Sequence, residues 1–170
     1  MASDNRRMER ARSIARGGKL PARADLTLSE ALVLGLLRQG VRKYFTVLGH
    51  GSTDVGEVLR VYQEAGLVRA FGVRSEIEAS HAAAALRWVA GEKAAVVTSI
   101  GPGALHAMAA SLVPASDGIG VWYLLGDETT EDEGCTGKQV PKSDRGTLLR
   151  LGAGAGTRSR RSEKKEGRGR

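Results

Sequence analysis

Apolar positions along the chain follow two spacings, one typical of helices and the other typical of short buried strands. From Leu28 to Leu37 they recur every three or four residues, which predicts an amphipathic helix. Thr27 and Glu30 have the spacing of a capping box at its start, and Gly40 ends it. Continuous apolar runs predict four strands, at residues 43–48, 67–73, 93–98 and 120–125. Further helices are expected at residues 54–65, 75–90 and 103–113.

Strands and helices alternate along residues 26–137 with short links between them. This order is typical of an α/β fold, because a parallel strand returns to its sheet through a crossover helix. We therefore predict a Rossmann-like three-layer domain with a mainly parallel sheet, helices on both of its faces, and basic tails at either end.

The charge of the chain is unevenly distributed and divides it into three parts. Residues 1–25 carry a net charge of +4, residues 26–137 carry −5, and residues 138–170 carry +8. The net charge of +7 therefore belongs to the two ends. We expect residues 1–25 to form a frayed basic helix or a disordered leader, and the Gly- and Arg-rich residues 138–170 to form a disordered tail.

Composition excludes several classes of protein. Aromatic residues make up 4% of the chain, so the core must be built from small aliphatic side chains. Cys135 is the only cysteine, which rules out an internal disulfide, and a cytoplasmic protein is expected. No apolar run reaches the roughly 18 residues of a membrane span. The arginines of the tail have no aromatic residues among them, so nucleic acid is an unlikely partner.

Polar turns follow the first three predicted strands, and the first and third of them contain glycine. The residues of interest are Gly49-His50-Gly51, Ser75-Glu76 and Gly101-Pro102-Gly103. Ligands of open parallel sheets bind beside such turns, at the carboxyl ends of the strands. His50 either faces a ligand or is an ordinary turn residue. Glu76 can be interpreted in two ways. It is either a functional carboxyl group in a pocket or an ordinary residue of a helix N-terminus, where acidic residues are favoured.

An acidic loop follows the last predicted strand, at residues 126–134. Its carboxylates lack a spacing that converges on one ion, so a solvated loop is favoured over a divalent-cation site. No metal ligands are assigned in this chain.

Taken together, the three turns resemble the pyrimidine-binding N-terminal domain of thiamine diphosphate-dependent enzymes, in the acetolactate synthase-like superfamily. The resemblance rests on Glu76 before the Ala-rich helix with His81, on Gly101-Pro102-Gly103, and on Gly49-His50-Gly51. It covers residues 26–137. The Gly-His-Gly and Ser-Ile-Gly-Pro-Gly patterns look nearest to those of trihydroxycyclohexanedione hydrolase.

The resemblance implies that thiamine diphosphate is the cofactor and that Glu76 is both catalytic and cofactor-binding. In this family the carboxyl group hydrogen-bonds a ring nitrogen of the aminopyrimidine and favours the imino form, which takes the proton from the thiazolium carbon. Burial favours the protonated acid that this requires, whereas the helix N-terminus opposes it. The remaining residues expected to line the pocket are Gly49, His50, Gly51, Gly101, Pro102 and Gly103.

Four neighbouring residues are assigned lesser roles. Ser75 departs from the His that many members have before the Glu, and Glu78 points to another side of the helix. His81 is expected to serve packing or an interface. His106, where many members have Asn, is a further candidate for the pocket.

The resemblance also implies that half of the site lies outside this sequence. The family binds the diphosphate and Mg²⁺ through a second domain with a Gly-Asp-Gly signature and downstream asparagines, whereas this chain has no Gly-Asp-Gly and its only asparagine is Asn5. The chain is therefore expected to be a small subunit or, slightly favoured, a truncated or frameshifted enzyme. The expected partner is a second copy or a subunit with the diphosphate-binding domain.

The activity that the resemblance implies is that of a carbon–carbon lyase or transferase, or a hydrolase, acting on 2-oxo or cyclic diketone substrates. Whether the chain is itself an enzyme stays open at this point. The alternative is a non-catalytic α/β binding module whose basic tails contact nucleic acid or an acidic partner.

Overall fold

The structure is a computed structural model of the chain, and it describes residues 2–18 and 24–127. Cys135, the predicted tail at residues 138–170 and all but the first two residues of the acidic loop lie outside the described residues. The elements in chain order are α1 (Ala2–Ala15), α2 (Leu28–Arg38), β1 (Lys43–Val47), α3 (Thr53–Glu64), β2 (Arg69–Gly72), α4 (Glu76–Ala90), β3 (Ala94–Thr98), α5 (Pro102–Ser116) and β4 (Trp122–Leu125).

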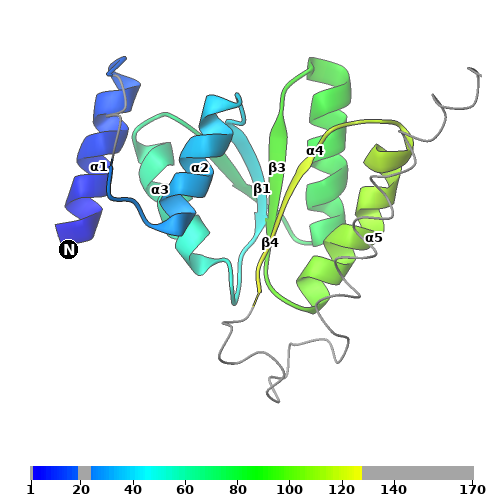
Figure 1. Cartoon of the computed structure of the whole chain (residues 1–170). Helices are drawn as coiled ribbons and strands as arrows, with labels where there is room; N and C mark the ends of the chain where they lie inside the picture. The colour runs from blue at the N-terminus through cyan, green and yellow to red at the C-terminus, as the bar shows by residue number, and fades with distance from the viewer. Residues whose placement is uncertain (1, 19–23, 128–170) are drawn as a thin grey trace, which may run out of the picture.

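The four strands form one parallel sheet in the order β2-β1-β3-β4. Helices α2 and α3 cover one face and helices α4 and α5 cover the other (Figure 1). From β1 the chain moves outward to β2, and from β3 it moves outward in the opposite direction to β4. The prediction of a three-layer α/β domain is confirmed, and the switch in direction falls between β1 and β3.

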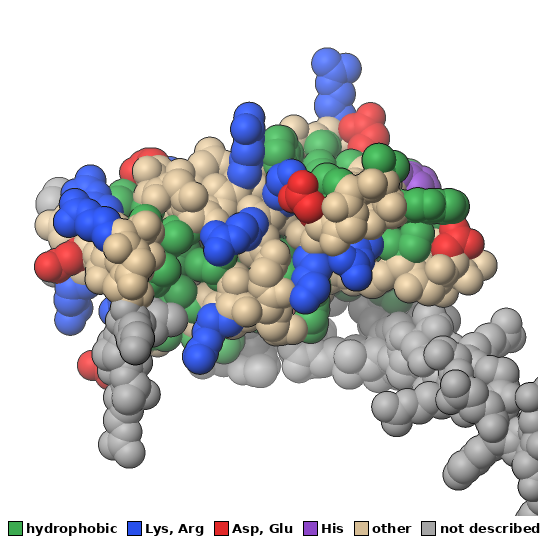
Figure 2. Space-filling view, turned by 90° about the horizontal axis from the view of Figure 1, so that it is seen from above, with side chains coloured by type: hydrophobic (Ala, Val, Ile, Leu, Met, Phe, Trp, Pro, Cys, Tyr) green, Lys and Arg blue, Asp and Glu red, His purple; other side chains and the backbone are tan. Residues whose placement is uncertain are grey.

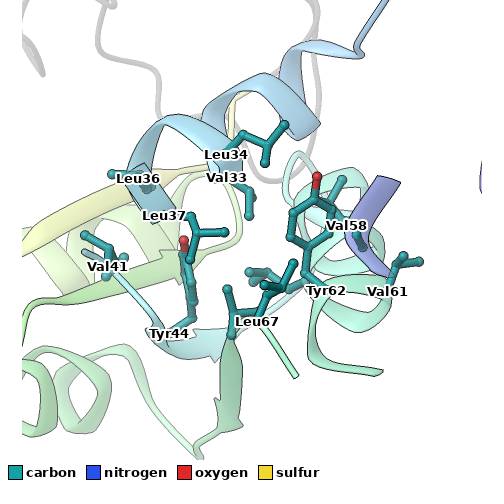
Figure 3. Packing of buried hydrophobic residues seen from close by; sticks show 14 of the residues in the cluster. Val33, Leu34, Leu36, Leu37, Val41, Tyr44, Val58, Val61, Tyr62 and Leu67 are labelled. Atoms are coloured by element: carbon teal, nitrogen blue, oxygen red, sulfur yellow. The ribbon is translucent and has the colours of Figure 1, made fainter. Parts of the chain in front are cut away.

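The face under α2 and α3 has a core of branched aliphatic side chains around two tyrosines (Figure 3). Tyr44 of β1 and Tyr62 of α3 are fully buried among them. Burial raises the pKa of both phenols, so both are neutral at physiological pH. The aliphatic residues labelled in the figure are Val33, Leu34, Leu36, Leu37, Val41, Val58, Val61 and Leu67.

The opposite face has a much smaller core, and it is built mainly from alanines. Ala79 and Ala83 of α4 and Ala107 of α5 are fully buried, and they pack with Ala94 and Val96 of β3. Side chains this small let two helices approach one another and the sheet closely. This close packing of the Ala-rich helix holds the first turns of α4 and α5 side by side.

Helix α5 extends further than predicted, because it continues past Pro114 to Ser116. The prediction ended the helix before this proline, which cannot donate a backbone hydrogen bond. Pro114 is buried, and its carbonyl oxygen accepts a hydrogen bond from Ile119 N–H at 2.7 Å.

The N-terminal residues hold a regular helix, α1, which packs beside α3 at the edge of the molecule (Figure 1). A disordered leader was one of two predictions for residues 1–25, and the described residues differ from it. The physical reason is that α1 has both apolar and ionic anchors. Ala11 is fully buried in the α2–α3 core, and Met8 and Ile14 pack against the same core.

The ionic anchor of α1 is Glu30, a residue of α2 that is only 3% exposed. Arg10 Nη1 donates to Glu30 Oε1 at 2.5 Å, and Arg7 Nε lies 3.8 Å from Oε2. Tyr62 Oη also donates to Oε1, at 3.1 Å. Thr27 Oγ1 accepts a hydrogen bond from the Glu30 N–H, as the capping-box spacing predicted. The Glu30 carboxylate itself pairs with the arginines of α1.

Lysine and arginine side chains gather at the amino-terminal edge of the sheet, which Figure 2 shows from above. Many of them pair with groups of the same edge. Lys93 Nζ donates to Gln39 O at 2.8 Å, Arg42 Nη1 donates to Leu67 O at 3.1 Å, and Lys43 is paired with Glu92. The C-termini of helices also lie at the amino-terminal edge of the sheet, and their carbonyl groups attract cations. No helix among the described residues is long and apolar enough to cross a membrane.

The Glu30→Gln substitution should lower the free energy of unfolding by about 1–3 kcal/mol, because it removes the buried negative charge that pairs with Arg10 and lies beside Arg7. Urea denaturation measures this. The matched control is Glu57→Gln, which removes an exposed partner of Arg60 and should change stability by about 0–1 kcal/mol. Equal losses in the two variants would show that Glu30 does not anchor α1.

Candidate functional site

The turns that follow β1, β3 and β4 meet at the carboxyl edge of the sheet, at the switch point between β1 and β3. Ile100 N–H donates to His50 O at 3.1 Å, and Gly126 N–H donates to Thr98 O at the same distance. These hydrogen bonds join the turns backbone to backbone. The turns that the sequence marked at residues 49–51 and 101–103 therefore belong to one continuous edge.

Glycines at this edge allow the turns to touch one another. A Cβ atom on Gly49 would lie 2.8 Å from Ser99 Cβ, and one on Gly103 would lie 2.5 Å from Ser99 Oγ. Gly51 has a φ of +76°, and its Cβ would lie 2.5 Å from Ile100 Cγ2. The sequence suggested glycine for close approach to a ligand. The structure shows that these three positions also require glycine for packing of the turns themselves.

The start of α5 is shaped by Gly101 and Pro102. Gly101 is the N-cap residue, with φ 60° and ψ −116°, a backbone conformation that favours glycine. Pro102 occupies the first helical position and is exposed. Proline is well tolerated there, because a backbone N–H at this position would have no hydrogen-bond partner within the helix.

The start of α4 is capped by Ser75 and Glu78. Ser75 Oγ accepts the Glu78 N–H at 3.2 Å, and the Glu78 carboxylate accepts the Arg74 N–H at 3.1 Å. This Ser-x-x-Glu spacing is a capping signal in the sequence, and it accounts for both residues. The helix start is thus satisfied without the carboxyl group of Glu76.

Glu76 is the first residue of α4, and it is only 9% exposed. Its Oε2 lies 3.3 Å from Nδ1 of His106, a residue of α5 whose side chain is 61% exposed. Its Oε1 lies 2.9 Å from the position of a Cβ on Gly103. The carboxyl group is therefore held between the first turns of α4 and α5.

The structure brings some of the predicted site residues together and separates others. Glu76, Gly103 and Gly49 lie in one group, which Ser99 connects. His50 and Gly51 belong to the adjoining contact with the turns after β3 and β4. His81, for which the sequence predicted a role in packing or at an interface, is exposed on α4. The described residues contain no group of three or more His, Cys, Asp or Glu side chains able to hold a metal ion.

Two residues are more central to this site than the sequence suggested. Ser99 fills the space between Gly49 and Gly103, and its place directly after a buried strand was the available signal. His106 contacts Glu76, although 30 positions separate the two in the chain. That contact depends on how α4 and α5 pack, which no local motif reports.

A doubly wound parallel sheet with a buried carboxyl group beside its switch point defines an α/β domain of the ligand-binding type. The family model described as "Thiamine pyrophosphate enzyme, N-terminal TPP binding domain" matches residues 26–148. Because this match covers more than half of the chain, the chain belongs to that family of thiamine diphosphate-dependent enzyme domains. The match extends to residue 148, whereas the resemblance seen in the sequence ended at residue 137. A comparison with curated proteins finds none that matches the chain.

The Gly103→Ala substitution should lower the free energy of unfolding by about 1–3 kcal/mol, because the new methyl group overlaps Ser99 Oγ and crowds Glu76 Oε1. Gly35→Ala is the matched control, since Gly35 also lies in a helix and has no atom within 4 Å of its Cβ position. It should raise stability by about 0.5–1 kcal/mol. Chemical denaturation compares the two, and a gain in both variants would contradict the packing described for Gly103.

Proposed function

We propose that this domain binds the aminopyrimidine ring of thiamine diphosphate through Glu76, as one half of a composite active site. The observation that carries the proposal is the environment of Glu76. Its carboxyl group is nearly buried, lies at the ligand-binding edge of the sheet, and is not needed to cap its own helix. Family membership identifies the cofactor, and this geometry selects the residue.

The residues at this edge suit a neutral aromatic ring. Glu76 is nearly buried, and a carboxyl oxygen that carries a proton can donate a hydrogen bond to a ring nitrogen. The turns that contain Gly49 and Gly103 pack together around Ser99 beside this carboxyl group, at the edge where we propose that the ring binds. Thiamine diphosphate, when bound, supplies the carbon nucleophile that attacks a carbonyl substrate. The task of Glu76 is to orient the ring and to hold a proton at its carboxyl group.

We further propose that the diphosphate and Mg²⁺ are held by another domain. The sequence contains no Gly-Asp-Gly, and no metal-binding group occurs within residues 2–18 and 24–127. Two hollows of about 640 and 420 Å³ adjoin α1, and neither is lined by Glu76. The substrates we propose are 2-oxo acids or cyclic diketones, in a cytoplasmic reaction.

The outer surface of α4 and α5 supports a partner. Helix α5 has no charged residue along its 15 positions, yet it lies in an outer layer. Leu112 and Val113 of α5 are exposed, as are Trp88 and Val89 of α4, with Trp88 at 71%. An uncharged apolar surface is compatible with a copy of itself, so we propose a second copy of this chain as its occupant.

If the chain is a homodimer, the Leu112→Glu substitution should shift it toward monomer, because the substitution places a charge in an apolar interface. Sedimentation velocity measures this at matched concentrations. Leu28→Glu is the control, since Leu28 is an equally large exposed side chain at the start of α2, away from this surface. A wild-type chain that is already monomeric would instead favour a subunit carrying the diphosphate-binding domain.

Calorimetry with thiamine diphosphate and Mg²⁺ tests the central proposal. The chain alone should bind weakly and turn nothing over, and a partner with the diphosphate-binding domain should strengthen binding. Glu76→Gln should weaken binding about tenfold or more and abolish activity of the assembled complex, since the amide cannot supply the carboxyl proton. Glu78→Gln is the control and should leave affinity within about threefold.

Unchanged binding and activity in Glu76→Gln would exclude this role. The second candidate function, a module that binds nucleic acid through basic tails, rests on the charge of residues 1–25 and 138–170. It would be favoured by RNA retention that is sensitive to salt and vanishes when residues 150–170 are deleted.

A further inference from the structure

We propose that His106 is a positioning residue for Glu76, with its Nδ1–H donating to Oε2 and leaving Oε1 as the carboxyl oxygen that faces the ligand. The contact itself follows from the geometry alone. Its consequence for the cofactor rests on the function proposed above. His106 is the side chain that hydrogen-bonds the Glu76 carboxyl group within the described part of the chain.

The two residues are held in place by the packing of their helices. Glu76 lies in the first turn of α4 and His106 lies near the start of α5, and alanines between the helices keep their backbones close. Ser80 ties the same turns together. Its Oγ donates to Glu76 O at 2.9 Å and also lies 3.5 Å from Ala107 O. This packing fixes the backbone positions from which the imidazole and the carboxyl group reach one another.

The two carboxyl oxygens have different neighbours, and this distinguishes them chemically. Oε2 faces Nδ1 of His106 at 3.3 Å, whereas Oε1 faces Gly103. A hydrogen bond from Nδ1–H occupies Oε2 and leaves Oε1 for a ligand. Without His106 the carboxyl group can exchange its two oxygens by rotation, so neither oxygen is reserved for the ligand.

This arrangement has a signature that is independent of any cofactor. A neutral imidazole carries its proton on one ring nitrogen, and the hydrogen bond determines which one. The carboxyl contact assigns the proton of His106 to Nδ1. His81, exposed on α4, provides an internal reference in the same protein.

Long-range nitrogen–proton NMR of the histidine rings tests the contact, at a pH where the imidazoles are neutral. In the wild-type full chain His106 should show the Nδ1–H tautomer. In Glu76→Ala it should change to the Nε2–H tautomer, while His81 stays the same in both. His106 in the Nε2–H form in the wild-type protein would overturn the proposal.

A set of His106 substitutions tests the positioning role through cofactor affinity. The side-chain nitrogen of Asn can lie near the Nδ1 position, whereas that of Gln lies nearer to Nε2. His106→Asn should therefore keep thiamine diphosphate affinity within about threefold, and His106→Gln and His106→Leu should each lose about tenfold. Circular dichroism confirms that each variant is folded. Equal affinity in all four proteins would overturn the positioning role.

The two experiments separate this proposal from the proposed function. If wild-type protein binds no thiamine diphosphate in any assembly, the proposed function fails and so does the cofactor role of His106. The tautomer measurement still decides whether His106 contacts Glu76. If wild-type protein binds and the Asn variant behaves like the Leu variant, only the role of His106 fails.

Discussion

The close packing of α4 against α5 is the constraint on which the candidate site depends. Glu76 and His106 lie at the starts of these helices, and Ala79, Ala83 and Ala107 set the distance between them. Larger side chains at these three positions would push the helices apart and separate the carboxyl group from the imidazole. The same packing explains why Gly103 tolerates no side chain, since its neighbours are Ser99 and the Glu76 carboxylate.

Three glutamates near helix starts illustrate how position assigns different tasks to one residue type. Glu78 caps the N-terminal backbone of α4, together with Ser75. Glu30 is buried in α2 and receives the arginines of α1. Glu76 performs neither task, and its carboxyl group faces the edge where three turns meet. Of the three, Glu76 is therefore the residue that we propose for contact with a ligand.

The two ends of the sheet differ in electrostatic character. At the amino-terminal edge, Lys93 and Arg42 donate hydrogen bonds to backbone carbonyl groups. Their positive charge offsets the partial negative charge of the helix C-termini at this edge. At the carboxyl edge, glycine turns pack closely around Ser99 beside the nearly buried carboxyl group of Glu76. The fold therefore concentrates its candidate chemistry at one end and uses much of the charge at the other for its own stability.

The sequence by itself determined the order of strands and helices from α2 onward, the caps at Thr27 and Gly40, and the polar turns at the carboxyl ends of the first three strands of the sheet. These features depend on local spacing and on glycine, which residues close in the chain decide. Family membership followed from the same turns, and the family match agrees with it.

Only the tertiary structure decided what contacts Glu76 and what holds α1. The Glu76–His106 pair spans 30 positions and the Arg10–Glu30 pair spans 20, so neither appears in any local pattern. The capping of α4 was only partly predictable from the sequence. Ser75 and Glu78 had the right spacing, but only the structure showed that they release Glu76 from that task. Contacts between distant segments arise from packing, and for that reason they required the fold.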